Sequence, residues 1–131
     1  MNKKLLTGAV AAMAFLLPQT AMGQTADFNI IPQPQQVVAD ASAPFVLNTN
    51  TVIYVQTNSQ DMKRNATMLA SYIQEATGIR PTIGKLVKGK PAIILSIDKT
   101  ISNAEGYRLN SDAKQIRIAG ASAAGVFYGI Q

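Results

Sequence analysis

The sequence predicts an α+β fold, in which two helices pack on a mixed β-sheet. Three observations predict it: short apolar runs end in turn residues, one long stretch has a helical apolar stripe, and a second helix follows the last predicted strand. The order along the chain is strands, helix, strands, helix, so a mixed α/β layer is the alternative description. The sequence contains no internal repeat and no low-complexity tract.

The first predicted strands precede a long helix. Val37–Ala39, Phe45–Leu47 and Thr51–Val55 are predicted strands, and the last two are predicted to form a hairpin because the asparagines between them tolerate positive φ. The helix is expected to begin after Asn58-Ser59, either of which can cap it, and to end at Gly78. Its apolar stripe consists of Met62, Ala66, Leu69, Ile73 and Ala76.

The remaining strands follow this helix. Pro81–Ile83 is predicted to be a short strand, and Ala92–Ile97 is an almost continuous apolar run, typical of a central strand covered on both faces. A hairpin is expected to join Tyr107–Leu109 to Ile116–Ile118 through a turn at Asn110–Lys114.

A second helix is expected after Gly120, which ends the last strand, with Ser122 as its cap. Gly125 is unfavourable inside a helix by about 1 kcal/mol relative to Ala. Close approach to a neighbouring strand explains a glycine at this position. The apolar face of the helix consists of Val126, Phe127 and Ile130.

Residues 1–23 are predicted to be a secretory signal peptide, outside the fold. Two lysines precede an apolar run at Leu5–Leu17, and Ala21–Gly23 supplies the small residues that a signal peptidase recognises. The run is short for a membrane span, and the alternative is an uncleaved N-terminal anchor. We therefore expect an exported protein, periplasmic or extracellular, with no stable membrane anchor after cleavage and a domain at residues 24–131.

The composition excludes several kinds of chemistry within this chain. It has no Cys and no His, so a Ser-His-Asp triad, a Cys-His dyad and His-ligated zinc are impossible here. Removal of the two signal lysines changes the balance of 12 basic and 7 acidic residues to 10 and 7, or +3. This mild charge gives no reason to expect a nucleic-acid partner, and we expect no metal and no cofactor.

One basic loop resembles a phosphate-binding motif but lacks its context. Gly84–Lys90 fits the first seven positions of G-x-x-x-x-G-K, whereas Pro91 occupies the position of the Mg²⁺-binding Ser or Thr. A strand is predicted next, where the motif requires a helix. Lys85, Lys88 and Lys90 therefore indicate a basic surface loop, and no interleaved aromatic residues favour nucleic-acid binding.

Other candidate motifs are weak. Ser96–Lys99 and Ser111–Lys114 have the S-x-x-K spacing, but they fall at a strand end and in a turn rather than on a helical turn. Asp98 and Glu105 flank a loop, and nothing indicates the burial that a glycosidase acid pair needs. The glycosylation pattern Asn65–Thr67 lies within the predicted helix. We assign no catalytic residue from these motifs.

Four segments occur in an order that is typical of one known family: "FNIIPQPQQV", "LASYIQEATGI", "AIILSID" and "EGYRLNSDAKQIRIAGASAAGVFYGIQ". Together they resemble the non-catalytic N-terminal domain of family 20 glycoside hydrolases, the β-N-acetylhexosaminidases. The resemblance covers essentially all of residues 24–131 and is most specific from Gly106 to Gln131. In the family this last run enters a helix that leads to a (β/α)₈ barrel. We therefore expect the chain to end inside that helix, without the barrel.

The resemblance implies an accessory, structural role in an exported β-N-acetylhexosaminidase. Such an enzyme removes terminal N-acetylhexosamine by substrate-assisted retaining hydrolysis, one of the exceptions to the two-carboxylate scheme. The family's catalytic Asp-Glu pair lies in the barrel, so this chain is expected to be inactive alone. Its expected partners are the barrel of the same polypeptide and, through the barrel, N-acetylhexosamine-containing glycans. The expected structural or interdomain positions are Gly106, Tyr107, Gly120, Gly125, Val126, Phe127, Tyr128 and Ile130.

Two alternatives remain open. Similar N-terminal domains precede the barrels of bacterial enzymes related to O-GlcNAc hydrolases, and the downstream sequence distinguishes these from family 20. The other alternative is a stand-alone glycan-binding module. Sugar-binding faces usually display aromatic platforms, whereas this chain has no Trp and places most of its Tyr and Phe at core-like positions.

Overall fold

The computed structural model describes residues 34–39 and 42–131. They belong to two units, Met1–Ala39 and Asp40–Gln131. The predicted signal peptide at residues 1–23 lies outside the described residues, as does the start of the "FNIIPQPQQV" segment. Within the described part of the first unit, the strand predicted at Val37–Ala39 is wrong: these residues form no strand, and their side chains are exposed.

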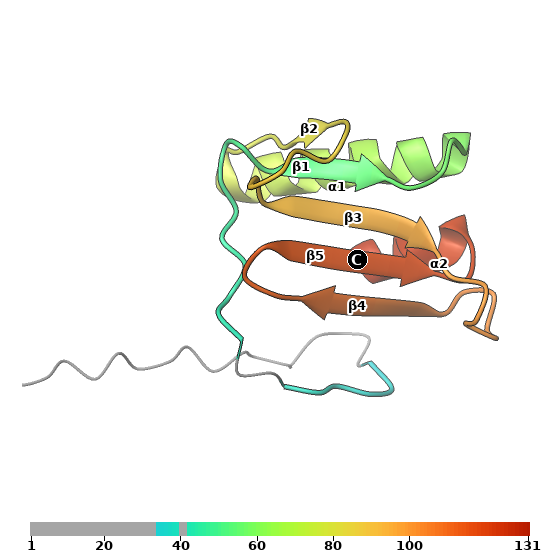
Figure 1. Ribbon diagram of the computed structural model, residues 1–131. Coiled ribbons are helices and arrows are strands. Elements are labelled where there is room, and N and C mark those ends of the chain that lie inside the picture. Colours follow the sequence, from blue (N-terminus) through green and yellow to red (C-terminus); the bar gives the residue numbers. More distant parts are fainter. Residues whose placement is uncertain (1–33, 40–41) are drawn as a thin grey trace, which may run out of the picture. The chain divides into compact units, whose positions relative to one another are not determined.

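In the second unit, residues 42–131 form one mixed sheet of five strands, in the order β2-β1-β3-β5-β4 (Figure 1). The antiparallel pair is β4 with β5, and the other three pairs are parallel. The predicted α+β class with a mixed sheet is therefore confirmed. The strands are β1 (Val52–Val55), β2 (Thr82–Ile83), β3 (Ala92–Ile97), β4 (Tyr107–Ser111) and β5 (Gln115–Gly120).

The hairpin predicted before β1 is wrong, because residues 45–47 form no strand, and among the described residues β1 pairs with β2 and β3. The asparagines form a local turn instead. The Asn48 carbonyl oxygen accepts from Thr51 N at 3.0 Å, and Asn48 Oδ1 accepts from Asn50 N at 2.8 Å. Among the described residues, only glycines have positive φ. The left-handed conformation that a tight hairpin turn requires is therefore not adopted here.

The long helix α1 spans Gln60–Thr77. Ser59 is its N-cap in an extended conformation, although its side chain makes no capping hydrogen bond. Gly78 ends the helix as predicted, with φ 75° and a hydrogen bond from its N–H to the Gln74 carbonyl at 2.8 Å. Most of the predicted stripe is buried: Met62, Ala66 and Leu69 lie in the core, whereas Ala76 is exposed.

The short helix α2 spans Ala123–Ile130, and the Ser122 hydroxyl accepts a hydrogen bond from Gly125 N at 3.3 Å. The predicted cap is therefore present. Both helices lie behind the sheet in Figure 1, on the same face, and they contact each other. No helix among the described residues has the length and apolar character that a membrane crossing needs.

The core lies between the helices and the sheet. Its fully buried side chains include Ile53 of β1, Met62 of α1, Leu95 of β3 and Val126 of α2. The central position predicted for β3 is correct, but the helices cover only one of its faces. On the other face Ile94 is still only 3% exposed. Its register partners there are Tyr54 of β1 and Arg117 of β5.

Candidate functional site

Glycines allow α2 to lie unusually close to β4 and β5. A Cβ atom at Gly125 would be 2.3 Å from the Gly106 carbonyl oxygen, and one at Gly120 would be 2.3 Å from Val126 N. Because real Cβ atoms do not approach backbone this closely, neither position accepts a side chain without movement of the backbone. The expected close approach of Gly125 is thus present, against the residue that precedes β4.

A further glycine in this contact was not predicted. A Cβ atom at Gly129 would be 2.6 Å from Ile118 Cγ2 and 3.1 Å from a ring carbon of Tyr107. Gly125 and Gly129 are four residues apart, so they share one face of the helix. That spacing is a sequence pattern that could have identified Gly129 as part of the helix–sheet contact.

The second residue that sequence reasoning missed is Asn65, in the middle of α1. Its side chain is 8% exposed, and its amide Nδ2 donates to the Ala123 carbonyl oxygen at 2.8 Å. This hydrogen bond joins α1 to the first residue of α2. Because Asn65 is buried within α1, its side chain is not available as a glycosylation acceptor, and the pattern Asn65–Thr67 is a coincidence of sequence.

A shallow groove lies between the outer surfaces of the two helices, with a volume of about 530 Å³. Phe127 and Tyr128 line it and are 38% and 45% exposed, with their rings edge to face at 5.6 Å. We call this hollow the helix-pair groove. Its lining residues are Asp61, Arg64, Asn65, Met68, Ala123, Ala124, Phe127 and Tyr128.

The expected interdomain positions on α2 thus fall into two groups. Val126 is completely buried and Ile130 packs against the core, so both contribute to the interior of this unit. Phe127 and Tyr128 instead expose aromatic surface beside the groove. Tyr107 is half-buried against the backbone of Gly129.

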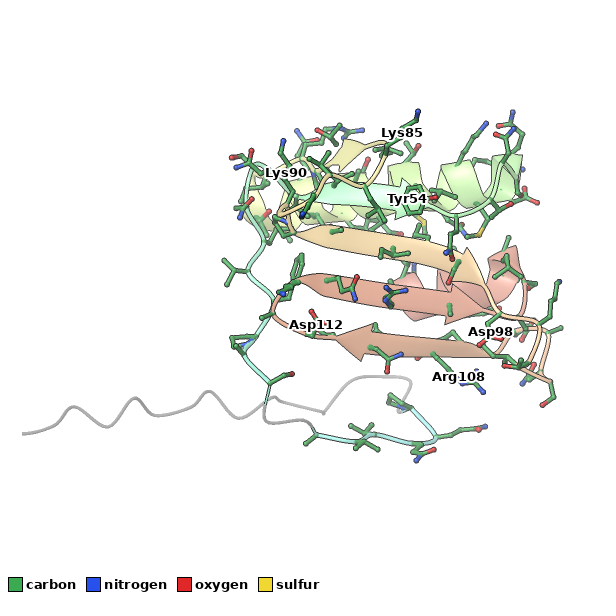
Figure 2. The ribbon with its side chains drawn as sticks, viewed as in Figure 1. Tyr54, Lys85, Lys90, Asp98, Arg108 and Asp112 are labelled. Carbon is green, nitrogen blue, oxygen red and sulfur yellow. The ribbon has the colours of Figure 1, made fainter. Side chains whose placement is uncertain are left out.

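The two carboxylates considered as an acid pair, Asp98 and Glu105, have different surroundings. Asp98 accepts hydrogen bonds from Thr100 N at 2.9 Å and Thr100 Oγ1 at 2.6 Å, and Arg108 approaches it to 2.6 Å (Figure 2). The Thr100 hydrogen bonds, with a smaller contribution from Arg108, lower the pKa of Asp98 below its ordinary value of 3.8. A general acid requires a raised pKa. Asp98 therefore lacks that property, and Glu105 is exposed.

The remaining motifs do not acquire the geometry that their chemistry needs. Gly84–Lys90 leads directly into β3, so no helix N-terminus follows the phosphate-loop-like pattern. Ser96 lies in β3 and Ser111 at the end of β4, so neither Ser-x-x-Lys pair shares a helical turn. Within the part of the chain that the structure describes, no group of three or more carboxylates could hold a metal ion.

Comparison with known proteins gives a consistent assignment. The family model described as "Glycosyl hydrolase family 20, domain 2" matches residues 27–131. A β-hexosaminidase from Porphyromonas gingivalis is 33% identical over 106 residues, which are 79% of this chain and 13% of that protein. The chain therefore spans only a small part of this relative.

Two solved structures of Streptomyces enzymes have the same fold. The GH20 β-N-acetylhexosaminidase of Streptomyces coelicolor A3(2) is 31% identical, with a TM-score of 0.66 over 77% of this chain and 20% of that chain. The N-acetyl-β-hexosaminidase of Streptomyces plicatus is 32% identical, with a TM-score of 0.67 over 77% of this chain and 19% of that chain. On these matches, the chain belongs to glycosyl hydrolase family 20, and residues 27–131 correspond to that family's domain 2.

Proposed function

We propose that this chain is a non-catalytic accessory domain of an exported β-N-acetylhexosaminidase, which removes terminal N-acetylhexosamine from glycans. Membership of family 20 supports the glycosidase class of the whole protein. In this proposal hydrolysis is substrate-assisted and retaining, and it takes place in a barrel of the same polypeptide. The described residues support that barrel and supply no reacting group.

The observation that carries the proposal is the helix-pair groove. Phe127 and Tyr128 expose aromatic rings on a helix whose backbone is held tightly against the sheet by Gly125 and Gly129. A fixed helix with exposed aromatic side chains is suited to packing against another domain. We therefore propose that the barrel packs on the helix-pair groove, opposite the exposed face of the sheet.

The carboxylates support an accessory role as well. Asp98 is held in its charged form by Thr100 and Arg108, so it lacks the raised pKa of a proton donor to a leaving group. Among the described carboxylates, Asp112 also has a lowered pKa, because its side chain accepts hydrogen bonds from Lys114 N and Gln115 N. Both groups stabilise turns next to β4.

Hydrolysis of a chromogenic N-acetyl-β-glucosaminide tests the proposal. The assay compares the full-length gene product with a protein ending at Gln131. We expect activity only in the longer protein, and we expect Asp98→Asn and Glu105→Gln to leave its kcat within about twofold. Activity in the shorter protein, or loss of activity in either variant without loss of folding, would contradict an accessory role.

A further inference from the structure

A second groove lies at the carboxyl ends of the parallel strands β1 and β2 and shares no lining residue with the helix-pair groove. It is a shallow, solvent-open hollow with a volume of about 390 Å³. We call it the β1–β2 groove. Its lining residues are Tyr54, Val55, Gln56, Thr57, Asn58, Lys63, Ile83, Gly84 and Lys85.

The β1–β2 groove lies outside the carboxyl ends of two parallel strands, at the edge of the sheet that β2 forms. At this edge the backbone that continues from both strands meets a side chain of α1. Here Gln56 to Asn58 continue from the end of β1, and Gly84 and Lys85 continue from the end of β2. Figure 2 shows Tyr54 near the end of β1 and Lys85 beyond the end of β2.

The charge of the β1–β2 groove favours an anion. Two lysines, Lys63 from α1 and Lys85 from the β2–β3 connection, line it together with no carboxylate. Both side chains are exposed, and among the described residues neither forms a salt bridge within 4.0 Å. Two ammonium groups at one groove with no acidic neighbour in its lining attract negatively charged ligands.

The other side chains favour a sugar as the carrier of that charge. Tyr54 is half-buried at the groove and supplies an aromatic surface with a polar hydroxyl, a combination suited to a pyranose ring. Gln56 and Asn58 are exposed, and their amides can donate to and accept from sugar hydroxyls. Within the described part of the chain, neither amide makes a side-chain hydrogen bond that would have to be broken.

We propose that the β1–β2 groove binds an anionic sugar residue, one that bears a carboxylate or a sulfate group. The ring lies on Tyr54, the amides of Gln56 and Asn58 bind its hydroxyls, and the ammonium groups of Lys63 and Lys85 pair with the anion. Its role rests on the proposed function: the groove would hold an acidic part of a glycan on which the parent enzyme acts.

Binding of defined tetrasaccharides to the full-length protein tests this site by titration calorimetry at low salt. The probes are an oligogalacturonate with carboxylates only, a carrageenan fragment with sulfates only, and the neutral cellotetraose. None contains N-acetylhexosamine, so their binding is independent of the proposed catalytic site. We expect at least one anionic probe to bind at least about tenfold more tightly than cellotetraose, and the tighter of the two identifies the anion.

Lysine variants distinguish specific binding in the β1–β2 groove from non-specific attraction to a basic surface. We expect Lys63→Gln with Lys85→Gln to weaken binding of the anionic probe about tenfold, because two ion pairs, each modest at an exposed site, are lost together. The matched control is Lys88→Gln with Lys90→Gln, which removes the same total charge from the β2–β3 connection that also carries Lys85. Neither of these lysines lines the groove, and Figure 2 places Lys90 at the opposite end of the sheet from Tyr54.

Several results would overturn the proposal. They are equal affinity for cellotetraose, no binding of either anionic probe, equal losses in the two double variants, or equally tight binding of a single-stranded DNA of matched charge. Tyr54→Phe should retain binding, whereas Tyr54→Leu should reduce it while keeping an apolar neighbour for Ile94. Hydrolysis of the chromogenic N-acetyl-β-glucosaminide should be unchanged in every variant, which keeps this test distinct from that of the proposed function.

Discussion

The side-chain amide of Asn65, in the middle of α1, donates a hydrogen bond of 2.8 Å to the backbone carbonyl of Ala123, the first residue of α2. The two residues are 58 positions apart in the sequence. Asn65 is buried, so its amide has little access to water. The bond therefore fixes the position of α2 against α1, and with it the shape of the helix-pair groove.

Asn65→Ala should destabilise the protein by about 1–3 kcal/mol, because it removes the hydrogen bond to Ala123 and leaves a cavity where the buried amide was. Urea unfolding combined with hydrogen exchange at the amides of α1 and α2 measures the change. Asn58→Ala is the control, since Asn58 is exposed and precedes the helix. Equal stability of the two variants would show that the bond has no structural importance.

Gly125→Ala and Gly129→Ala should each destabilise the folded protein, although alanine is favoured over glycine in an isolated helix by about 1 kcal/mol. At Gly125 the added Cβ would meet the backbone carbonyl of Gly106 at 2.3 Å, whereas at Gly129 it would first meet the side chain of Ile118 at 2.6 Å. A side chain can move more easily than backbone. We therefore expect a loss of about 1–3 kcal/mol for Gly129→Ala and a larger loss for Gly125→Ala.

Gly84→Ala is the matched control for these two changes. An added Cβ there meets nothing within 4 Å, and the φ angle of Gly84 is not positive. This variant should be neutral or slightly stabilising in the same urea experiment. If all three alanine variants had the same stability, the close helix–sheet contact would not be the reason for the glycines on α2.

The elements that could be predicted from sequence are those specified by local patterns. The stripe of α1, the apolar run of β3 and the cap of α2 each depend on residues close together in the chain. The failures arose where nonlocal contacts decide the structure. The sequence around Asn48 is compatible with a hairpin, but β1 pairs with β2 and β3 instead.

The same distinction applies to the candidate sites. The close approach of Gly125 to its neighbour could be predicted because glycine is unfavourable in a helix and its presence there needs a reason. The bond between Asn65 and Ala123 depends on how α1 and α2 are placed, and no local pattern specifies that placement. The β1–β2 groove likewise gathers residues from β1, α1 and the β2–β3 connection, so its lysines and amides are scattered in the sequence.

The charged carboxylate of Asp98 should stabilise the folded protein at neutral pH and lose this effect in strong acid. Its folded pKa lies below the ordinary value of 3.8, mainly because of the hydrogen bonds from Thr100. The folded state therefore favours the charged carboxylate, and this stabilisation is fully present above the unfolded pKa and is lost as the pH falls through the folded pKa. Asp98→Asn should be less stable than the parent protein at pH 7, and the difference should disappear in strong acid.

Urea midpoints measured for both proteins from neutral to strongly acidic pH give this comparison directly. Glu105→Gln provides the control, since Glu105 is exposed and accepts no side-chain hydrogen bond from the described residues. A difference between Asp98→Asn and the parent protein that is constant across the whole pH range would contradict a role for the charged form.

If the protein is exported, signal-peptide cleavage should produce one defined N-terminus. If residues 1–23 act as a signal peptide, the secreted protein should begin at Gln24, and Edman sequencing or intact mass should detect this terminus. Substituting two of the apolar residues within Leu5–Leu17 by aspartate should keep the protein in the cytoplasm, and its N-terminus should remain uncleaved. An uncut N-terminus in a membrane fraction of the unmodified protein would instead support the anchor alternative.

Phe127 and Tyr128 should stabilise the whole protein through contact with another domain rather than through the interior of this unit. In the full-length protein, changing both to Ser should destabilise by about 1–2 kcal/mol per ring, because aromatic surface is then lost from the proposed contact with the barrel. The readout is the urea midpoint for loss of glycosidase activity. Tyr72→Ser is the control, since Tyr72 is 43% exposed on α1 but does not line the helix-pair groove. Equal effects of the groove changes and the control would place the barrel contact elsewhere on the domain.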